Sequence, residues 1–256
     1  MNPKISVVMS VYNQGQYLPQ AIDSILYQSL ADFEFLIMDD TSTDSTPQIL
    51  TSYRDRRINV FTHRRRSGLA GSLNQLIKKS QADYIARMDA DDIAYPQRLK
   101  IQLDYLTCHP HVAACGTAVD LINSAGKPIG QKTFPRHITK TLLMRYNPLI
   151  HSTVMAKKEF CTYDQTLNGA EDYDLWLRLG GKYKLANINQ VLSAYRVNPQ
   201  GISWNSLKCT ELQAIKARLK ALGRYNYPLW QSIFLTKPIL SYFIPTWVKK
   251  LIFNIK

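Results

Sequence analysis

Two aspartates, Asp89 and Asp91, carry the sharpest chemical signal in the chain because they follow an apolar run at residues 84–88. Carboxylates two positions apart at the end of a strand can project to the same side and hold a hard divalent cation. The phosphates of a nucleotide could then fill the remaining coordination positions of that cation. Aspartates in turns more often cap or solvate the chain, so the surrounding segments must decide what this pair does.

Two other apolar runs end in polar residues in the same way. One leads into Asp39 and Asp40, and the other leads into Tyr12 and Asn13. A carboxylate at the edge of a sheet can accept a hydrogen bond from a base N–H or a ribose hydroxyl, and an aromatic ring offers a surface against which a base can lie. We also expect one member of the Asp39–Asp40 pair to cap the turn that follows it.

Apolar runs and helical-period segments alternate along the first half of the chain. The predicted strands cover residues 5–11, 33–38, 58–61 and 84–88, and the predicted helices cover 17–26, a segment from about 45, and 68–79. The second half is less regular, with helices predicted at 96–106, 171–179 and 203–222 and strands at 112–119, 127–134, 152–156 and 191–195. This alternation predicts an α/β fold with a mainly parallel sheet flanked by helices, whose strands end on one ligand-binding edge.

The composition fits one large domain or two small ones. The 256 residues are 45% hydrophobic and 20% charged, which is enough for a substantial core and excludes a disordered chain. The four cysteines include no CxxC pair, so we expect neither a disulfide scaffold nor a structural zinc site. The first apolar run is too short for a signal peptide, so we expect a cytoplasmic protein.

Positive charge is concentrated in the last fifty residues, which contain nine of the 32 basic residues and a single acid, Glu211. The uncharged stretches there, residues 225–236 and 238–248, are shorter than the roughly 20 residues that span a bilayer. Aromatic residues such as Trp230 and Trp247 beside lysines suit a segment lying peripherally on the inner face of the cell membrane. A helical cover packed on the domain, or a dimer contact, is an equally good hypothesis.

Five segments in series carry a family resemblance: ISVVMSVYN, FEFLIMDDTSTDST, RSGLAGSLN, YIARMDADDIAYPQRL and GAEDYDLWLRL. Their order and spacing, over about residues 4–200, resemble glycosyltransferases of family 2, which have the GT-A fold. The resemblance implies an inverting transferase that uses Mn²⁺ or Mg²⁺ and moves a sugar from a nucleotide-diphosphate donor to an acceptor hydroxyl. UDP is the expected nucleotide, and a glycan or lipid-linked acceptor in cell-surface polysaccharide or glycolipid synthesis is the expected substrate.

The resemblance also implies roles for individual residues. The nucleotide-sugar site would be formed by residues at the strand ends or in the neighbouring loop, namely Ser10, Val11, Tyr12, Asn13, Asp39, Asp40, Gly68, Ser72 and Asp89. Asp91 would bind the metal, and Asp172 would be the catalytic base. An inverting displacement needs both parts, because a base must take the proton from the acceptor hydroxyl and a cation must stabilise the departing diphosphate.

Three further residues are candidates for acceptor or diphosphate contacts. His151 resembles a polar position that faces the cleft in bacterial members, although a lone histidine is more often structural. Glu171 precedes the predicted base, and an acidic first helical turn is its ordinary explanation. Arg196 could meet phosphate. Where the family often has a metal-supporting histidine after the last strand, this chain has Asn198, a weaker ligand.

The predicted organisation is a catalytic domain at residues 1–206, with a nucleotide-binding half at 1–92 and an acceptor-binding half at 93–206. A helical, basic and aromatic extension follows at 207–256. Two alternatives compete with the transferase. A sugar-1-phosphate nucleotidyltransferase would need a glycine-rich loop after the first strand, which is missing here. A non-enzymatic membrane-binding or nucleic-acid-binding protein would explain the charge alone, but no groove-binding motif accompanies it, so we expect no nucleic-acid partner.

Overall fold

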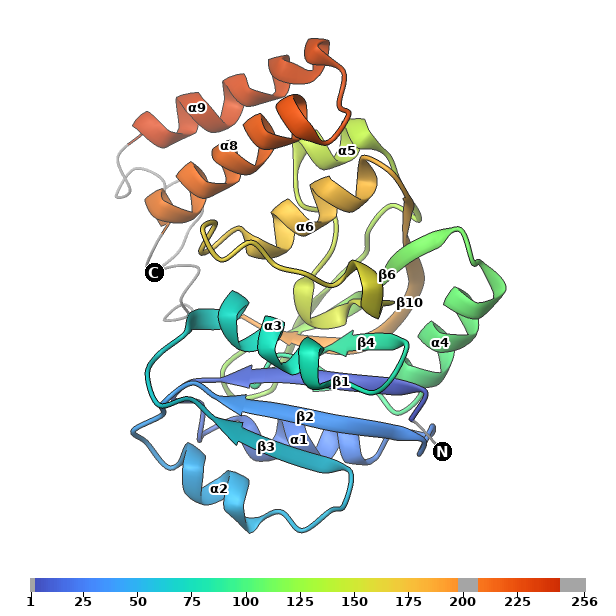
Figure 1. The fold of residues 1–256 in the computed structure, drawn as a ribbon, viewed down its shortest axis with the longest axis vertical. Coiled ribbons are helices and arrows are strands. Elements are labelled where there is room, and N and C mark those ends of the chain that lie inside the picture. The colour runs from blue at the N-terminus through green and yellow to red at the C-terminus, as the bar shows by residue number, and fades with distance from the viewer. Residues whose placement is uncertain (1–2, 198–206, 245–256) are drawn as a thin grey trace.

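One twisted sheet organises the molecule in the computed structural model, which describes residues 3–197 and 207–244. Its strands follow the order β3-β2-β1-β4-β9-β6-β10-β5, with β7 paired to β6 and β8 paired to β10 (Figure 1). The strands are β1 (Ile5–Val11), β2 (Phe33–Asp39), β3 (Ile58–Thr62), β4 (Tyr84–Arg87), β5 (Ile93–Ala94), β6 (Val112–Ile122), β7 (Pro128–Lys132), β8 (His137–Ile138), β9 (Met155–Lys157) and β10 (Lys184–Arg196). This is the predicted α/β architecture.

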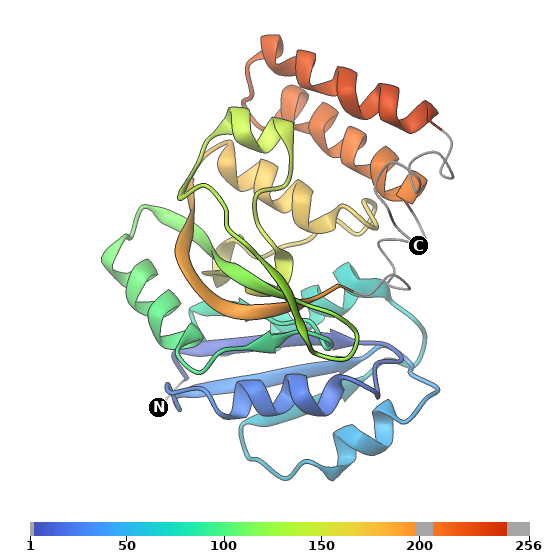
Figure 2. The ribbon, with the colours of Figure 1, turned by 180° about the vertical axis from the view of Figure 1, so that it is seen from behind.

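Helices cover both faces of the sheet and extend beyond it. The α-helices are α1 (Leu18–Leu26), α2 (Thr46–Ser52), α3 (Gly68–Lys79), α4 (Arg98–Cys108), α5 (Lys140–Arg145), α6 (Glu171–Gly180), α8 (Leu207–Arg224) and α9 (Thr236–Phe243). Three 3-10 helices are η1 (His151–Thr153), η2 (Lys158–Phe160) and η3 (Leu229–Leu235). Seen from opposite sides, α3 covers one face of β1 and β2 and α1 covers the other (Figures 1 and 2).

The first half of the sheet is parallel, and its strands β1 and β2 are buried on both faces, as is usual in parallel sheets. β1 alternates its side chains between two cores, with Val8 packed toward α3 and Val7 and Met9 packed toward α1. β3, β2, β1 and β4 all pair in parallel, as continuous buried runs predict. The predicted helix at 68–79 matches α3 at both ends.

The second half of the sheet is mixed rather than parallel. β9 lies between β4 and β6 and is antiparallel to both, whereas β10 is parallel to β6 and antiparallel to β5. The strand predicted at 191–195 begins earlier, at Lys184. The polar Asn187 interrupts the apolar pattern of its first half, but this side chain is buried and donates to the Pro135 and Pro148 carbonyls. The strand predicted at 152–156 is shorter, since the Thr153 hydroxyl bonds the Ile150 carbonyl in a 3-10 turn.

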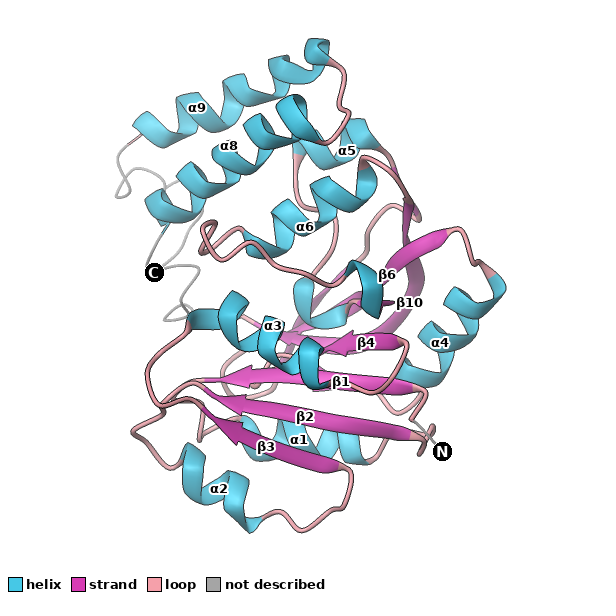
Figure 3. Ribbon diagram, viewed as in Figure 1, coloured by secondary structure: helices cyan, strands magenta, loops and turns pink. Residues whose placement is uncertain are grey.

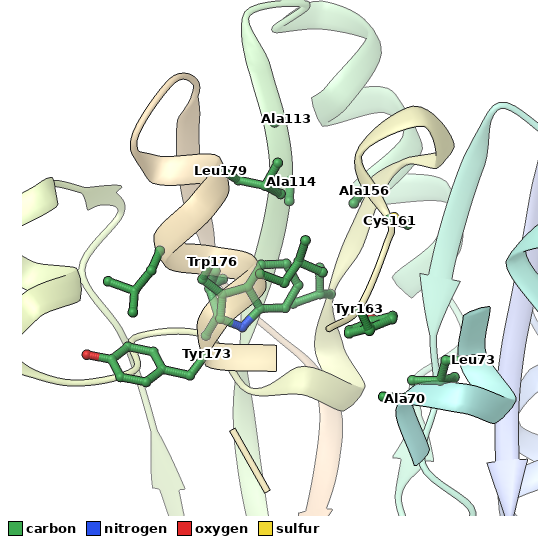
Figure 4. Close-up of a cluster of buried hydrophobic side chains, with 14 of the residues drawn as sticks. Ala70, Leu73, Ala113, Ala114, Ala156, Cys161, Tyr163, Tyr173, Trp176 and Leu179 are labelled. Atoms are coloured by element: carbon green, nitrogen blue, oxygen red, sulfur yellow. The ribbon is translucent and has the colours of Figure 1, made fainter. Parts of the chain in front are cut away.

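A helical layer stands at the end of the molecule opposite β3 and consists of α5, α6, α8 and α9 (Figure 3). Trp176 of α6 is 1% exposed and lies centrally in the cluster of buried side chains beneath that layer (Figure 4). Ala217 and Ala221 of α8 join the same core, and the Tyr227 hydroxyl donates to the Leu177 carbonyl at 2.9 Å. The C-terminal extension therefore packs on α6 through its first helix.

The described part of the extension contains α8, η3 and α9. None of the described helices is long and apolar enough to cross a membrane. The predicted start of the helix at 203–206 and the aromatic and basic residues after 244, including Trp247, lie outside the described residues. The predicted domain boundary at residue 206 stays a prediction.

Candidate active site

Three parallel strands deliver their carboxyl ends to one edge of the sheet. Val11 of β1 pairs with Asp39 of β2, and the Asp40 N–H donates to the Val11 carbonyl at 2.9 Å. β4 pairs with β1 on its other side, and Asp89 follows two residues after β4 ends. The strand-end residues singled out in the sequence therefore share the edge at which open α/β sheets bind ligands.

An aspartate cluster occupies the centre of this edge. Asp89, Asp91 and Asp92 each place a carboxylate oxygen within 4.8 Å of the others. Burial and the charge of Asp89 raise the pKa of Asp91 to about 6, and burial with both neighbouring carboxylates raises the pKa of Asp92 well above its usual range. Three crowded carboxylates repel one another, so this cluster favours a bound cation.

The donor set of the cluster fits a hard divalent ion such as Mn²⁺ or Mg²⁺, which bind carboxylate oxygens. Asp92 is 2% exposed, and the Ser152 hydroxyl and the Arg196 N–H favour its ionised form without outweighing burial and the two neighbouring carboxylates. A buried carboxylate beside two others is costly unless a cation or a proton meets it. The sequence assigned the metal to Asp91 and a ribose contact to Asp89. In the structure both lie in one cluster with Asp92.

Two buried arginines, Arg87 and Arg98, lie next to the aspartate cluster. Arg87, 2% exposed on β4, forms an ion pair with Asp89, while its Nε and Nη1 atoms find no partner among the residues described. The Nη2 atom of Arg98 donates to the Arg87 carbonyl at 2.6 Å. The positive charge of the Arg87 guanidinium offsets part of the mutual repulsion of the three carboxylates, which keeps the aspartates together in the absence of metal.

Arg196 takes a different place from the predicted diphosphate contact. It is 3% exposed, and its backbone N–H donates to Asp92 Oδ1 at 2.8 Å. Four of the five guanidinium N–H groups point at protein acceptors: the carbonyls of Asp91, Asn123 and Ser124 and the Gln20 side chain. Because these bonds direct the guanidinium inward, Arg196 braces the aspartate turn. Asn198, the residue in place of the family histidine, lies outside the described residues.

The two aspartates after β2 bind backbone N–H groups. Asp39 accepts from Ser42 N at 2.9 Å, which is the turn cap expected of one member of the pair. Asp40 accepts from Ser67 N at 2.7 Å and Gly68 N at 2.9 Å, so its carboxylate caps the start of α3. Gly68 has a φ of +73°, a conformation that favours glycine. Asp40 thereby holds the loop that the sequence assigned to nucleotide binding.

The residues at the end of β1 contact the loops that follow β2 and β3. Asn13 is exposed, its Oδ1 accepts from Thr43 N at 2.8 Å, and its φ is +51°. The ring of half-buried Tyr12 lies 3.7 Å from the Arg66 guanidinium, measured to the ring centroid. Ser10 is half-buried at the end of β1, and Val11 is 1% exposed. Among these residues after β1, Tyr12 thus offers an aromatic ring near the carboxyl-end edge of the sheet.

Ser72 does not lie in the loop where the sequence placed it. It falls within α3 on the buried stripe that includes Leu73 and Leu76, and it is 0% exposed. Helical spacing explains the difference, because positions 72, 73 and 76 share one face of a helix that begins at Gly68. Of the two predicted residues, only Gly68 lies at the loop.

Asp172 and Glu171 stand in the first turn of α6. Asp172 Oδ2 accepts from Asn147 Nδ2 at 2.8 Å, and burial together with the charge of Glu171 raises the pKa of Asp172 to about 6. Glu171 is 6% exposed and accepts from the Gly169 N–H, and burial raises its pKa. A carboxylate with a pKa near neutrality can both lose and gain a proton at physiological pH.

Two side chains link the aspartate cluster electrostatically to Asp172. Burial raises the pKa values of both Asp91 and Asp172, and the positive charge of Arg87 offsets part of both rises because it favours the ionised carboxylates. The pKa of the Tyr195 hydroxyl is raised by burial, then by the three cluster aspartates and by Asp172. Both carboxylate groups therefore act on the same buried space near the edge of the sheet.

His151 belongs to an aromatic network under α6. Its Nε2 atom lies 2.8 Å from the Tyr163 hydroxyl, and its ring packs edge-on against Tyr163 and Trp176. Burial and the nearby charge of Arg87 lower the pKa of His151 well below its usual range, so the ring is neutral at pH 7. These contacts match the structural interpretation of this histidine better than a cleft-facing one.

A family model described as Glycosyl transferase family 2 matches residues 6–167, which is more than half of the chain. The chain is a family 2 glycosyltransferase. The family membership makes the protein an enzyme of the transferase class and sets aside the nucleotidyltransferase and non-enzymatic alternatives.

Curated relatives and solved structures agree with this assignment. The glycosyltransferase is 31% identical to putative glycosyltransferase EpsE of Bacillus subtilis (strain 168), over 95% of this chain and 90% of that protein. It is 32% identical to the O-antigen biosynthesis glycosyltransferase WbnJ of Escherichia coli, over 84% of this chain and 87% of that protein. S. aureus TarS 1–349 in complex with UDP-GlcNAc matches with a TM-score of 0.74 at 17% identity, over 99% of this chain and 76% of the other. That likeness shows the GT-A fold.

Several side chains of the glycosyltransferase site escaped the sequence analysis. Arg87 carried a signal, since a charged residue inside an otherwise apolar strand is unusual. Asp92 stood in the same acidic run as Asp91 but was not singled out. Asn147 and Tyr195 gave no signal, because only tertiary packing brings them beside Asp172 and the aspartate cluster.

Proposed function

We propose that this glycosyltransferase transfers a sugar from a nucleotide-diphosphate donor to an acceptor hydroxyl with inversion at the anomeric carbon. The observation that carries the proposal is the pairing of a crowded aspartate cluster with Asp172, a separate carboxylate whose pKa is raised to about 6. An inverting transfer requires one group that holds the diphosphate and another that removes a proton. The two carboxylate groups divide these tasks.

The aspartate cluster would hold the divalent ion, with Asp91 as the principal ligand and Asp89 and Asp92 beside it. When bound, Mn²⁺ or Mg²⁺ stabilises the negative charge of the departing diphosphate. Pyrobaculum calidifontis mannosyltransferase PcManGT, solved with GDP-Man and Mn²⁺, supports this assignment through its fold, with a TM-score of 0.63 and 16% identity over 94% of this chain and 75% of that one. Arg87 and Arg196 keep the aspartates in place.

Asp172 would act as the catalytic base. Asn147 binds its Oδ2 atom and Tyr173 N binds its Oδ1 atom, so the carboxylate has a fixed orientation. The proton of the acceptor hydroxyl would pass to this carboxylate while the hydroxyl oxygen forms the bond to the anomeric carbon and the diphosphate leaves. A pKa of about 6 leaves Asp172 ionised at pH 7 and still basic enough to accept the proton.

The nucleotide would lie along the ends of β1 and β2. Tyr12 offers its ring to the base, and Ser10, Asn13 and Asp40 offer polar atoms beside it. UDP is the proposed nucleotide. The UDP and UDP-GlcNAc complexes of S. aureus TarS support that choice by fold likeness.

The acceptor would be a glycan or a lipid-linked saccharide of the cell surface. Support comes from the names of relatives, including the O-antigen enzyme WbnJ and an Escherichia coli UDP-Glc:alpha-D-GlcNAc-diphosphoundecaprenol beta-1,3-glucosyltransferase, which is 28% identical over 80% of this chain and 81% of that protein. With such an acceptor, the proposed place of the reaction is the cytoplasm, at the inner face of the membrane.

Calorimetry with UDP, GDP and dTDP, each with and without Mn²⁺, tests the donor site. We expect Mn²⁺-dependent binding of one nucleotide by the unmodified protein and its loss in Asp91→Asn. Asp104→Asn is the matched control, because Asp104 is an exposed helical aspartate paired with Lys100. No binding of any nucleotide by folded protein, or equal loss in both variants, would contradict the proposal.

A further inference from the structure

The outward face of η3 and α9 is a continuous apolar stripe. Leu229, Trp230, Ile233, Leu240 and Phe243 are 75%, 62%, 62%, 68% and 75% exposed. Trp230, Ile233, Leu240 and Phe243 are spaced by three or seven residues, which puts them on one side of the helical segment, and Leu229 adjoins Trp230 at its start. We call these five residues the outer stripe. Large apolar side chains exposed in a contiguous group mark a surface that meets another apolar phase.

The orientation of the outer stripe is fixed by contacts on the opposite face of the same segment. Gln231 is 2% exposed and donates to the Thr141 hydroxyl, and Leu235 is 7% exposed. The Ser241 hydroxyl donates to Glu211 of α8 at 2.8 Å. Because this inner face is docked on α5 and α8, the segment cannot turn its stripe toward the core.

Charge identifies the occupant of the stripe. Lys237 lies exposed between Ile233 and Leu240, and three basic residues of α8 are exposed as well, namely Lys208, Lys216 and Arg224. A second copy of the chain would bring the same positive charge to the contact. An anionic lipid surface brings the opposite charge, and Trp and Phe side chains favour the boundary between headgroups and acyl chains.

We propose that the outer stripe docks this protein on an anionic membrane surface. The apolar side chains enter the interface while Lys237, which lies among them in the sequence, meets the lipid headgroups. The stripe lies on the outermost helix, at the end of the molecule away from β3 (Figures 1 and 3). α9 packs on α8, and α8 packs on α6, whose first turn carries Asp172. Docking would therefore bring the predicted catalytic base within two helical layers of the lipid.

Co-sedimentation with vesicles tests the proposal on the full chain. The vesicles contain phosphatidylcholine alone or a mixture of phosphatidylcholine with the anionic lipid phosphatidylglycerol. We expect binding to the anionic vesicles only, weakened by salt. We expect Leu240→Glu to lower the partition coefficient at least tenfold, an order-of-magnitude estimate for placing a charge in an apolar contact.

Ile129→Glu is the matched control, because Ile129 on β7 is 55% exposed and lies outside the stripe. It should bind vesicles like the unmodified protein. Lys237→Glu keeps the apolar stripe and should weaken binding to anionic vesicles only. Circular dichroism reports folding in every variant. An unmodified protein that binds anionic vesicles but no nucleotide would count against the proposed donor site and not against the docking surface.

Three outcomes would overturn the docking surface. The first is an unmodified protein that binds neither kind of vesicle, and the second is equal vesicle binding by Leu240→Glu and Ile129→Glu. The third is a dimer in analytical ultracentrifugation that Leu240→Glu converts to a monomer while vesicle binding is absent, which would assign the stripe to a second copy.

Discussion

The ends of β2 and β4 carry aspartates in similar sequence contexts and on one sheet edge, yet the two groups do different things. Asp39 and Asp40 accept hydrogen bonds from the backbone N–H groups of Ser42, Ser67 and Gly68. Asp89, Asp91 and Asp92 crowd together, with carboxylate oxygens within 4.8 Å of one another. An acidic strand end can thus hold a loop where backbone N–H groups bind its carboxylates, or favour a cation where three carboxylates crowd together.

Removing a carboxylate from the crowded group should have the largest effect on turnover. We expect Asp91→Asn to lower the rate of nucleotide release from the donor by about 10³-fold or more, because several kcal/mol of charge stabilisation at the diphosphate are lost. The rate is measured with saturating Mn²⁺ and the donor that calorimetry identifies. Asp104→Asn should leave the rate unchanged. A rate above one tenth of the original for Asp91→Asn would mean that the cluster does not hold the catalytic metal.

The second largest effect on turnover should come from Asp172, which belongs neither to the Asp39–Asp40 pair nor to the aspartate cluster. Asp172→Asn keeps the hydrogen-bonding shape of the side chain but removes the base, so turnover should fall by about 10² to 10⁴-fold. Nucleotide affinity in calorimetry should stay within a factor of about two or three, since the base does not contact the nucleotide. A variant that loses affinity and turnover in parallel would assign Asp172 to donor binding instead.

The pH dependence of turnover should follow Asp172. Burial raises its pKa to about 6, and the base must be ionised to accept a proton, so activity is present above pH 6. Below pH 6 the rate should fall about tenfold per pH unit as the carboxylate becomes protonated. Asn147→Ala removes the hydrogen bond that favours the ionised form, so the midpoint should move to higher pH. An unchanged midpoint in Asn147→Ala would show that another group controls the profile.

The loop-building pair should respond in stability more than in chemistry. Asp40→Asn loses at least one of two buried charge-assisted hydrogen bonds, which costs about 1 to 3 kcal/mol in the free energy of unfolding. Chemical denaturation in EDTA measures this cost. In the same experiment Asp91→Asn should be more stable than the unmodified protein, because it relieves repulsion among three carboxylates. Equal destabilisation of both variants would remove the distinction between the two groups.

Sequence patterns predicted the parts of this molecule that depend on local periodicity. β1 to β4 and α3 fall within one or two residues of the prediction because buried apolar runs and helical spacing are local signals. A strand was predicted at 152–156, but its place between β4 and β6, antiparallel to both, was not, since pairing with distant strands leaves no local pattern. In the site, the predicted strand ends indicated that the aspartates would lie on one sheet edge, but the direction in which a side chain points depends on tertiary packing. Ser72 and Arg196 therefore turned out to be buried.

The smallest expected effect separates the two groups by pH. The pKa of Asp91 in the folded, metal-free protein is raised to about 6 from an unfolded value near 4. The folded state then binds more protons than the unfolded state between these values, so stability in EDTA should fall as the pH rises from 4 to 6. The free energy of unfolding should drop by about 1 kcal/mol or more across that window. Asp91→Asn should make the curve less steep, with the remaining slope due to the other buried carboxylates, whereas Asp40→Asn should keep the original slope. Saturating Mn²⁺ should reverse the trend, because the ion binds only ionised carboxylates and adds more stability as the pH rises.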